Sequence, residues 1–170
     1  MNTVLEPETL QAKTEEKKTG KKILFVCTGN TCRSPMAAAL YNAQYGTDGS
    51  HAFSAGLAAD GSGISRNAVL ALLGAGIRSG EGNDYLSHVS HTVTEEDLQK
   101  ADLVVGITGR HAMQLMFAAP AFASRITSLP VDIGDPYGGD EQVYADCLAQ
   151  IAEALAQMFA SSEKEDDRHA

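Results

Sequence analysis

A cysteine and an arginine six residues apart flank a short segment that can hold an oxyanion. Cys27 and Arg33 bound the sequence CTGNTCR, which follows an apolar run and precedes helix-forming residues. Backbone N–H groups in such a loop can all point inward, and the following helix adds its positive end. A guanidinium offers a planar fork to two phosphate oxygens. The same field favours the thiolate of Cys27, so the segment predicts nucleophilic attack of sulfur on phosphorus.

A carboxylate in the loop DIGDPYGGDE can supply the proton that this reaction needs. Asp135 precedes Pro136, which restricts the residue before it to an extended conformation. The leaving atom requires an acid, and the water of the second step requires a base. We expect Asp135 to fill both roles, with Asp132 as the alternative. The hydroxyl of Ser34 can hydrogen-bond the thiolate when it leaves the phosphoenzyme.

The elements that position these residues alternate between strands and helices. This alternation predicts an α/β domain with a mostly parallel sheet covered on both faces. Ligands of such sheets bind at the carboxyl ends of strands, where Cys27 falls. We predict strands at 22–27, 51–54, 102–107 and 126–129, and helices from Pro35 with Ser34 as N-cap, after the N-cap Ser65, after a capping box at 94–97, over 111–118 and from Glu141.

The overall composition argues against two classes of partner. The chain has 170 residues, 44% of them apolar, and its 13 basic and 22 acidic residues give a net charge of −9. Such a surface repels nucleic acid and anionic lipid, so we expect neither as a partner. No apolar run is long enough to span a bilayer, and no signal-peptide pattern is present. We expect a cytoplasmic protein, and a monomer.

The three cysteines are too few for a disulfide framework, and their spacing does not match a zinc site. In the cytoplasm they should be reduced. Cys32 either forms a reversible disulfide with Cys27, which would protect the nucleophile from overoxidation, or fills the base of the loop. The sequence leaves both open. Cys147 falls on the apolar face of the last helix, and we expect it in the core.

One folded domain is predicted over residues 22–160. The preceding residues, 1–21, are polar and rich in lysine and glutamate, and we expect them to form a disordered leader. Residues 161–170 are charged, and we expect a flexible tail.

The motifs together resemble the low-molecular-weight protein tyrosine phosphatase family. The resemblance runs from about residue 22 to residue 159 and rests on CTGNTCRSPMA at 27–37, FSAG at 53–56, SHVS at 87–90, ADLVVGIT at 101–108 and DPYGG at 135–139. It implies a four-stranded parallel sheet, a phosphocysteine intermediate on Cys27, phosphate held by Arg33, and Asp135 as acid and then base. Phosphorylated protein side chains would be the substrates and inorganic phosphate the product, with neither cofactor nor metal. By the same likeness, the substrate is bound by Thr28, Gly29, Asn30, Thr31, Cys32, Ser34 and Tyr137, and the loop is supported through hydrogen bonds of Asn30, Ser54 and His88.

Two positions bear on the choice of substrate. Position 31 is Thr, as in the protein arginine phosphatase branch of the family, whereas the tyrosine-directed members usually carry an aliphatic residue there. The acid loop reads DPYGG, so Gly138 replaces the second aromatic residue that is typical of tyrosine enzymes. We therefore predict phosphoarginine as the preferred substrate and phosphotyrosine as the alternative. The segment 76–88 is longer than the family pattern, so we expect the surface near the site to differ from that of the family.

Three other functions compete with this interpretation. An arsenate reductase on the same scaffold needs two further cysteines after the third strand, and residues 109–130 contain none. A non-catalytic phosphate-binding module would have lost Cys27, Arg33 or Asp135, and all three remain. A Cys-His hydrolase needs a histidine as the base for Cys27, which a thiolate held by an anion-binding loop does not require. We assign no role to His91, His111 or His169.

Overall fold

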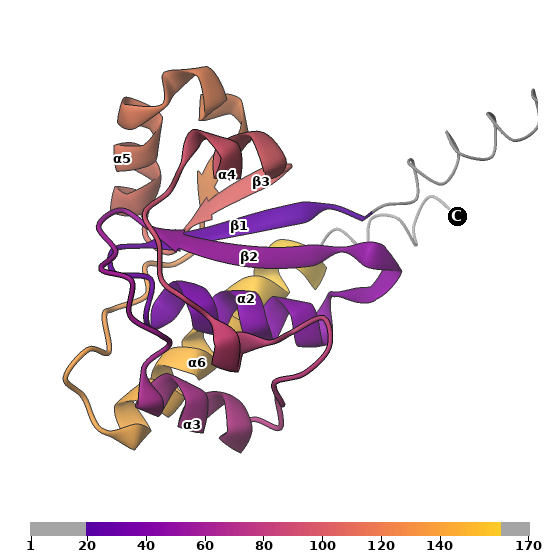
Figure 1. The fold of residues 1–170 in the computed structure, drawn as a ribbon, viewed down its shortest axis with the longest axis vertical. Helices are drawn as coiled ribbons and strands as arrows, with labels where there is room; N and C mark the ends of the chain where they lie inside the picture. Colours follow the sequence, from indigo (N-terminus) through magenta and orange to yellow (C-terminus); the bar gives the residue numbers. More distant parts are fainter. Residues whose placement is uncertain (1–19, 161–170) are drawn as a thin grey trace, which may run out of the picture.

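Four parallel strands form the centre of the fold in the computed structural model, which describes residues 20–160. They are β1 (Lys22–Cys27), β2 (His51–Gly56), β3 (Leu103–Gly106) and β4 (Ile126–Ser128), in the order β2-β1-β3-β4 (Figure 1). β1 lies between β2 and β3 in the sheet, and every residue from Ile23 to Cys27 is buried. The predicted α/β fold with a four-stranded parallel sheet is confirmed. β2 runs two residues further than predicted, to Gly56.

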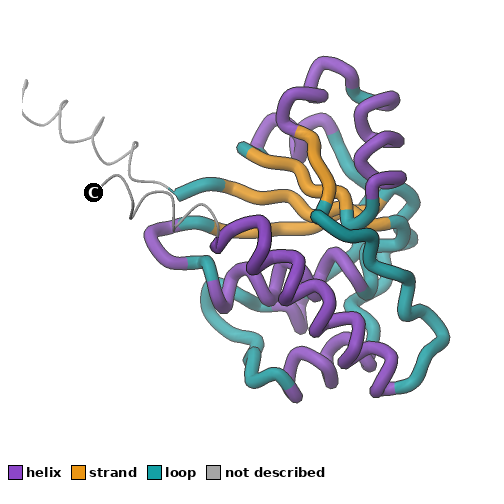
Figure 2. Tube along the Cα trace, turned by 180° about the vertical axis from the view of Figure 1, so that it is seen from behind, coloured by secondary structure: helices purple, strands orange, loops and turns teal. Residues whose placement is uncertain are grey.

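Helices cover both faces of the sheet, as the sequence predicted. On one face lie α2 (Arg33–Gln44), α3 (Arg66–Gly74) and α6 (Glu141–Leu155), and on the other α4 (Glu95–Lys100) and α5 (Gly109–Ala118) (Figures 1 and 2). Side chains alternate along a strand, so Ile23 and Phe25 pack in the first core while Leu24 and Val26 pack in the second. This two-sided burial explains why β1 reads as a continuous apolar run. Three short 3₁₀ helices were not predicted, at Thr47–Gly49, Tyr85–Ser87 and Pro120–Arg125, and the last helix continues as a π-helix over Ala156–Ala160.

The start of α2 differs from the prediction. We expected Ser34 as the N-cap and Pro35 as the first helical residue, but the helix begins at Arg33 and Cys32 occupies the N-cap without a side-chain cap. The Ser34 hydroxyl cannot cap because it lies against Cys27, Asn30 and the carbonyl of Ala55. Pro35 still fits, since the first turn of a helix requires no N–H from it. Because α2 starts earlier than predicted, Arg33 and Ser34 belong to its first turn, directly after the loop that follows β1.

Two other helices begin at the N-cap side chains that the sequence predicted. Ser65 accepts from the N–H of Ala68, and Thr94 forms the predicted capping box with Asp97. The apolar side of α6 is buried, and Cys147 lies in the core as expected. The predicted leader and tail lie outside the described residues except for residues 20 and 21, so those domain bounds stay a prediction. No helix within residues 20–160 is long and apolar enough to cross a bilayer.

Candidate active site

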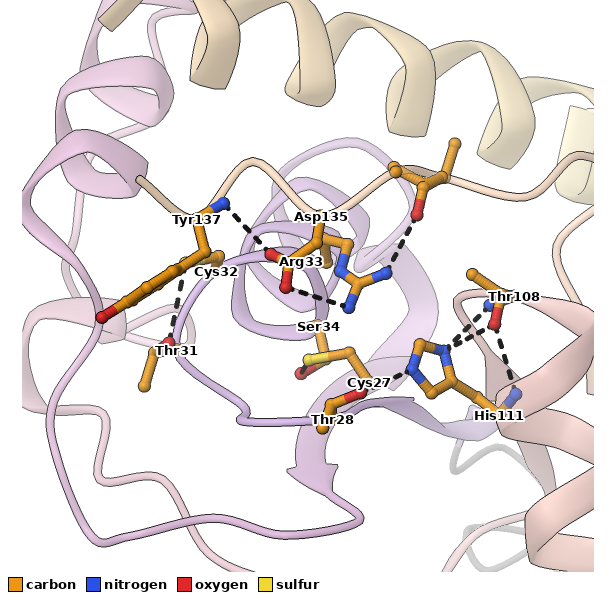
Figure 3. Close-up of polar contacts among 12 residues, drawn as sticks. Cys27, Thr28, Thr31, Cys32, Arg33, Ser34, Thr108, His111, Asp135 and Tyr137 are labelled. Carbon is orange, nitrogen blue, oxygen red and sulfur yellow. Dashed lines mark hydrogen bonds and ion pairs between the residues drawn. The ribbon is translucent and has the colours of Figure 1, made fainter. Parts of the chain in front are cut away.

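The loop after β1 forms one wall of a pocket at the carboxyl end of the sheet. Cys27 ends β1 and Arg33 begins α2, so the five residues between them make the whole strand-to-helix turn (Figure 3). The pocket has a volume of about 400 Å³, and it is lined by Cys27, Thr28, Gly29, Asn30, Thr31, Cys32, Arg33, Ala58, Asp60, Ser62, Asp135 and Tyr137. Three residues that the sequence singled out separately therefore meet in one hollow: the candidate nucleophile, the arginine and the candidate acid.

The sulfur of Cys27 has two polar neighbours. The Ser34 hydroxyl lies 2.9 Å from Sγ, and the backbone N–H of Asn30 donates to Sγ at 3.3 Å. Cys27 is buried except where it meets the pocket. Hydrogen-bond donors at these distances stabilise a sulfur that carries negative charge. The Ser34 hydroxyl and the Asn30 N–H can therefore stabilise negative charge on this sulfur.

Asn30 organises the loop from a fully buried position. Its backbone has a φ of 61°, in the left-handed region that asparagine tolerates better than most residues. Its side-chain amide donates to Ser34 Oγ at 2.8 Å and to Ser54 Oγ at 3.0 Å, and its side-chain oxygen accepts from the N–H of His91 at 3.2 Å. Both polar atoms of the side chain are used, so the turn has little freedom to rearrange.

His88 supports the same turn from a distant segment. Its Nε2 lies 2.8 Å from the carbonyl oxygen of Asn30, so Nε2 carries the proton and donates. Burial lowers the pKa of His88, which keeps the ring neutral around pH 7 despite the opposing effect of that hydrogen bond. Gly56 allows the close approach of β2, because a Cβ there would lie 2.5 Å from the carbonyl oxygen of Thr28. Ser54 and His88 thus gather around Asn30, where the family resemblance implied them.

Arg33 reaches from the first turn of α2 toward the acid loop. Its guanidinium is buried; Nη1 donates to the carbonyl of Ile133 at 3.0 Å, and Nη2 lies 3.7 Å from Asp135 Oδ2. The Asp135 side chain is 56% exposed and accepts from the N–H of Tyr137 at 3.1 Å (Figure 3). The carbonyl holds one end of the guanidinium in place, while the pocket-facing N–H groups remain available for an anion.

Asp132, the alternative acid, is engaged elsewhere. Its Oδ1 accepts from the N–H of Gly109 at 2.8 Å, at the start of α5, and the residue is absent from the pocket lining. A carboxylate tied to a helix start is poorly placed to reach a leaving group. The geometry favours Asp135.

The base of the loop is packed by Cys32. Its thiol is free and buried, 3.2 Å from the hydroxyl of Tyr144 and 3.5 Å from that of Ser65. Burial and the neighbouring thiol raise the pKa of Tyr144 to about 12, so its hydroxyl stays protonated. This agrees with the packing interpretation of Cys32, and a disulfide with Cys27 stays a prediction. Thr31 lies at the pocket wall beside Tyr137, whose ring is 81% exposed at the mouth.

Three residues near the site escaped the sequence analysis. His111, to which no role was assigned, is buried and contacts Thr28, and His91 Nε2 lies 2.9 Å from Asp97 Oδ2. The Thr108–His111 spacing is that of a capping box, a signal that could have placed His111 near the carboxyl end of β3. Asp60, in the segment after β2, adds a second carboxylate to the pocket rim. Within residues 20–160, no three His, Cys, Asp or Glu side chains gather as a metal site.

Comparisons with known proteins agree on one family. The family model described as low molecular weight phosphotyrosine protein phosphatase matches residues 22–168. A protein-arginine-phosphatase of Bacillus subtilis is 35% identical over 153 residues, which cover 84% of this chain and 97% of that protein. An arsenate reductase of Halalkalibacterium halodurans is 38% identical over 125 residues, or 74% of this chain and 83% of that one. A solved structure of a YwlE arginine phosphatase mutant with a phosphorylated active-site serine superimposes with a TM-score of 0.74 at 34% identity, covering 86% of this chain and 98% of the other.

Proposed function

The chain belongs to the low molecular weight phosphotyrosine protein phosphatase family, and from that premise we propose that it hydrolyses phosphoarginine side chains of proteins through a phosphocysteine intermediate on Cys27. The chain is a low-molecular-weight protein phosphatase. The observation that carries the proposal is the single pocket shared by Cys27, Arg33 and Asp135.

In the first step, the thiolate of Cys27 attacks phosphorus and the bond from phosphorus to the leaving group breaks. Arg33 and the inward N–H groups of the loop bind the non-bridging oxygens as their charge is redistributed. Asp135, at the mouth, gives its proton to the departing atom. The products are the phosphocysteine and the free side chain. A phosphorylated active-site serine in a similar arginine phosphatase supports a phosphoenzyme of this kind.

In the second step, water attacks phosphorus from the side that the leaving group vacated. Asp135, now ionised, takes a proton from this water, and the sulfur–phosphorus bond breaks. The thiolate returns to the hydrogen bonds of Ser34 and the Asn30 N–H. Inorganic phosphate leaves and the starting state is restored, so protons and charges balance over the cycle.

The pocket rim supports a substrate with a positive group beside the phosphoryl group. Asp60 lies at the mouth of the pocket, whereas the one cation in the lining, Arg33, lies buried at the floor. The hydrogen bonds from Ser62 lower the pKa of Asp60, so it is ionised at neutral pH. A phosphorylated guanidinium presents the complementary pattern, an anion below and a cation above. Phosphotyrosine offers no cation to the Asp60 carboxylate.

The acid loop also favours a substrate that needs no aromatic slot. Tyr137 supplies one exposed ring at the mouth, and the next residue, Gly138, has a φ of +81°. A side chain at that position would strain the backbone, so a second aromatic wall is disfavoured by the loop conformation itself. One ring can stack on a planar guanidinium, although it can also meet a tyrosine ring, and phosphotyrosine remains the second candidate substrate.

We do not propose the arsenate reductase activity that is named for the Halalkalibacterium halodurans relative and for others. That chemistry needs further reactive cysteines, and the third cysteine of this chain, Cys147, lies buried in α6. Burial raises the pKa of its thiol to about 11, so Cys147 is protonated and a poor nucleophile at neutral pH.

The substrate preference is tested by replacing Thr31 with isoleucine. The Thr31 hydroxyl at the pocket wall can polarise a guanidinium leaving group, which an alkyl side chain cannot. We therefore expect the ratio of kcat/KM for a phosphoarginine peptide to that for the matched phosphotyrosine peptide to fall by roughly tenfold, the effect of losing one hydrogen bond to a polar leaving group. The two peptides control for each other, because damage to the loop would slow both. An unchanged ratio would refute the part of the proposal that rests on Thr31, and hydrolysis of phosphotyrosine alone would refute the phosphoarginine assignment.

A further inference from the structure

A buried histidine beside the catalytic loop has no part in the two steps above. His111 lies in the first turn of α5 and is 5% exposed. Its Nε2 is 3.0 Å from the hydroxyl of Thr28, the residue that follows Cys27 (Figure 3). Its other ring nitrogen faces Thr108, at the end of the segment after β3. The ring therefore joins the catalytic loop to the neighbouring strand-to-helix turn.

The contacts of the ring fix the position of its proton. The backbone N–H of Thr108 donates to Nδ1 at 3.2 Å, and the Thr108 hydroxyl lies 2.9 Å from the same nitrogen while accepting from the His111 N–H. Because Nδ1 accepts, the neutral ring carries its hydrogen on Nε2. Nε2 then donates to Thr28, and the Thr28 hydroxyl must accept in this contact.

The electrostatic surroundings keep the ring neutral. Burial and the nearby charge of Arg33 lower the pKa of His111 to about 4, against smaller opposing effects of Asp132 and Asp135. With both nitrogens engaged and no charge near pH 7, His111 is unsuited to act as an acid or base in catalysis. Its effect on the reaction must pass through Thr28.

We propose that His111 is a positioning residue that orients the Thr28 hydroxyl, so that Thr28 donates its own hydrogen into the pocket to a phosphoryl oxygen. The Thr28 side chain is suited to this, because the residue is exposed and lines the pocket next to Cys27. Because the Thr28 hydroxyl oxygen accepts from the fixed Nε2–H of His111, its own hydrogen points away from the histidine. A phosphoryl oxygen bound in the pocket can accept that hydrogen. The inference rests on the proposed function, since it concerns the same phosphoryl site.

The test compares variants of both residues. Thr28→Val and His111→Leu should each lower kcat by about ten- to hundredfold, the usual loss for one hydrogen bond to a charged group. The double variant should be no slower than either single variant, because both remove the same donor. Thr28→Ser and His111→Gln should recover most of the loss, since each keeps a hydroxyl or an N–H donor. His51→Leu, at the opposite end of β2 from the site, is the matched control and should leave kcat unchanged.

Binding of inorganic phosphate separates this inference from the proposed function. By calorimetry, Thr28→Val and His111→Leu should lose phosphate affinity by a similar factor, whether or not the substrate has been identified correctly. A purely structural role for His111 would lower the thermal stability and leave phosphate affinity and kcat as they are, which would overturn the inference. Effects of the two substitutions that multiply in the double variant would overturn it as well. If His111→Leu does not fold, Thr28→Val alone decides: unchanged phosphate affinity and kcat in that variant would also overturn the inference.

Discussion

Replacing Cys27 with serine is expected to abolish turnover and to leave phosphate binding intact. A serine hydroxyl is protonated at neutral pH, and the side chain that contacts Sγ of Cys27 is the Ser34 hydroxyl, which is not a base, so the loss should reach at least about 10⁴-fold. The loop N–H groups and Arg33 are unchanged by the substitution and still bind an oxyanion. Hydrolysis of an aryl phosphate measures the first effect, and calorimetric titration with inorganic phosphate measures the second.

Cys147→Ser is the matched control for that experiment. It makes the same change of sulfur to oxygen in α6, outside the residues that line the pocket. Turnover should persist in this variant, with any cost appearing in stability because Cys147 is part of the core. Activity that survives in Cys27→Ser, or is lost equally in Cys147→Ser, would be incompatible with Cys27 as the nucleophile.

Replacing Asp135 with asparagine should slow the reaction according to the leaving group. Asparagine keeps an oxygen for the Tyr137 N–H but has no acidic proton to transfer to the leaving group. For a phosphate ester with a poor leaving group, we expect kcat to fall by roughly 10²- to 10⁴-fold, the range for general acid catalysis. An activated aryl phosphate leaves without protonation, and its first step should be nearly unaffected. Single-turnover rates over a series of aryl phosphates give the dependence on leaving-group acidity.

Asp132→Asn is the control for the acid. Its carboxylate caps the start of α5 through Gly109 rather than facing the pocket, so the leaving-group dependence should match that of the unmodified protein. If Asp135→Asn slows good and poor leaving groups equally, Asp135 contributes through its contact with Arg33 and not as an acid. If Asp132→Asn gives the selective loss, the assignment of the acid is wrong.

Local sequence determines much of the fold and of the loop. β1 is buried on both faces, so it must be apolar throughout, and it ends where Gly29 and the following helix formers begin. The candidate nucleophile and arginine could be found because the loop that joins them is continuous in sequence. The N-cap of α2 could not be predicted, because the Ser34 hydroxyl is drawn to Cys27 and Asn30 and is unavailable for capping.

Residues that meet the loop from distant segments were harder to predict. His111 reaches Thr28 across 83 positions, and the contact exists only because β1 and β3 are neighbours in the sheet. Asp60 comes from a segment whose course after β2 is set by hydrogen bonds from Leu57 and Ala58 to the loop carbonyls. Neither residue type stands out in the sequence. The remaining pair, Ser54 and His88, was found only through the family resemblance, since both meet at Asn30 only once the chain has folded.

The most direct test of the central claim is to locate the phosphoryl group during the first turnover. The protein is mixed with an excess of an activated aryl phosphate, denatured within milliseconds to seconds, digested and analysed by mass spectrometry. We expect the mass of one phosphoryl group on the sulfur of Cys27, appearing at the rate of the initial burst of product, whereas Cys27→Ser should give no burst. A phosphoryl group on Cys32, on Cys147 or on an oxygen side chain, or a burst without any modified peptide, would contradict the mechanism.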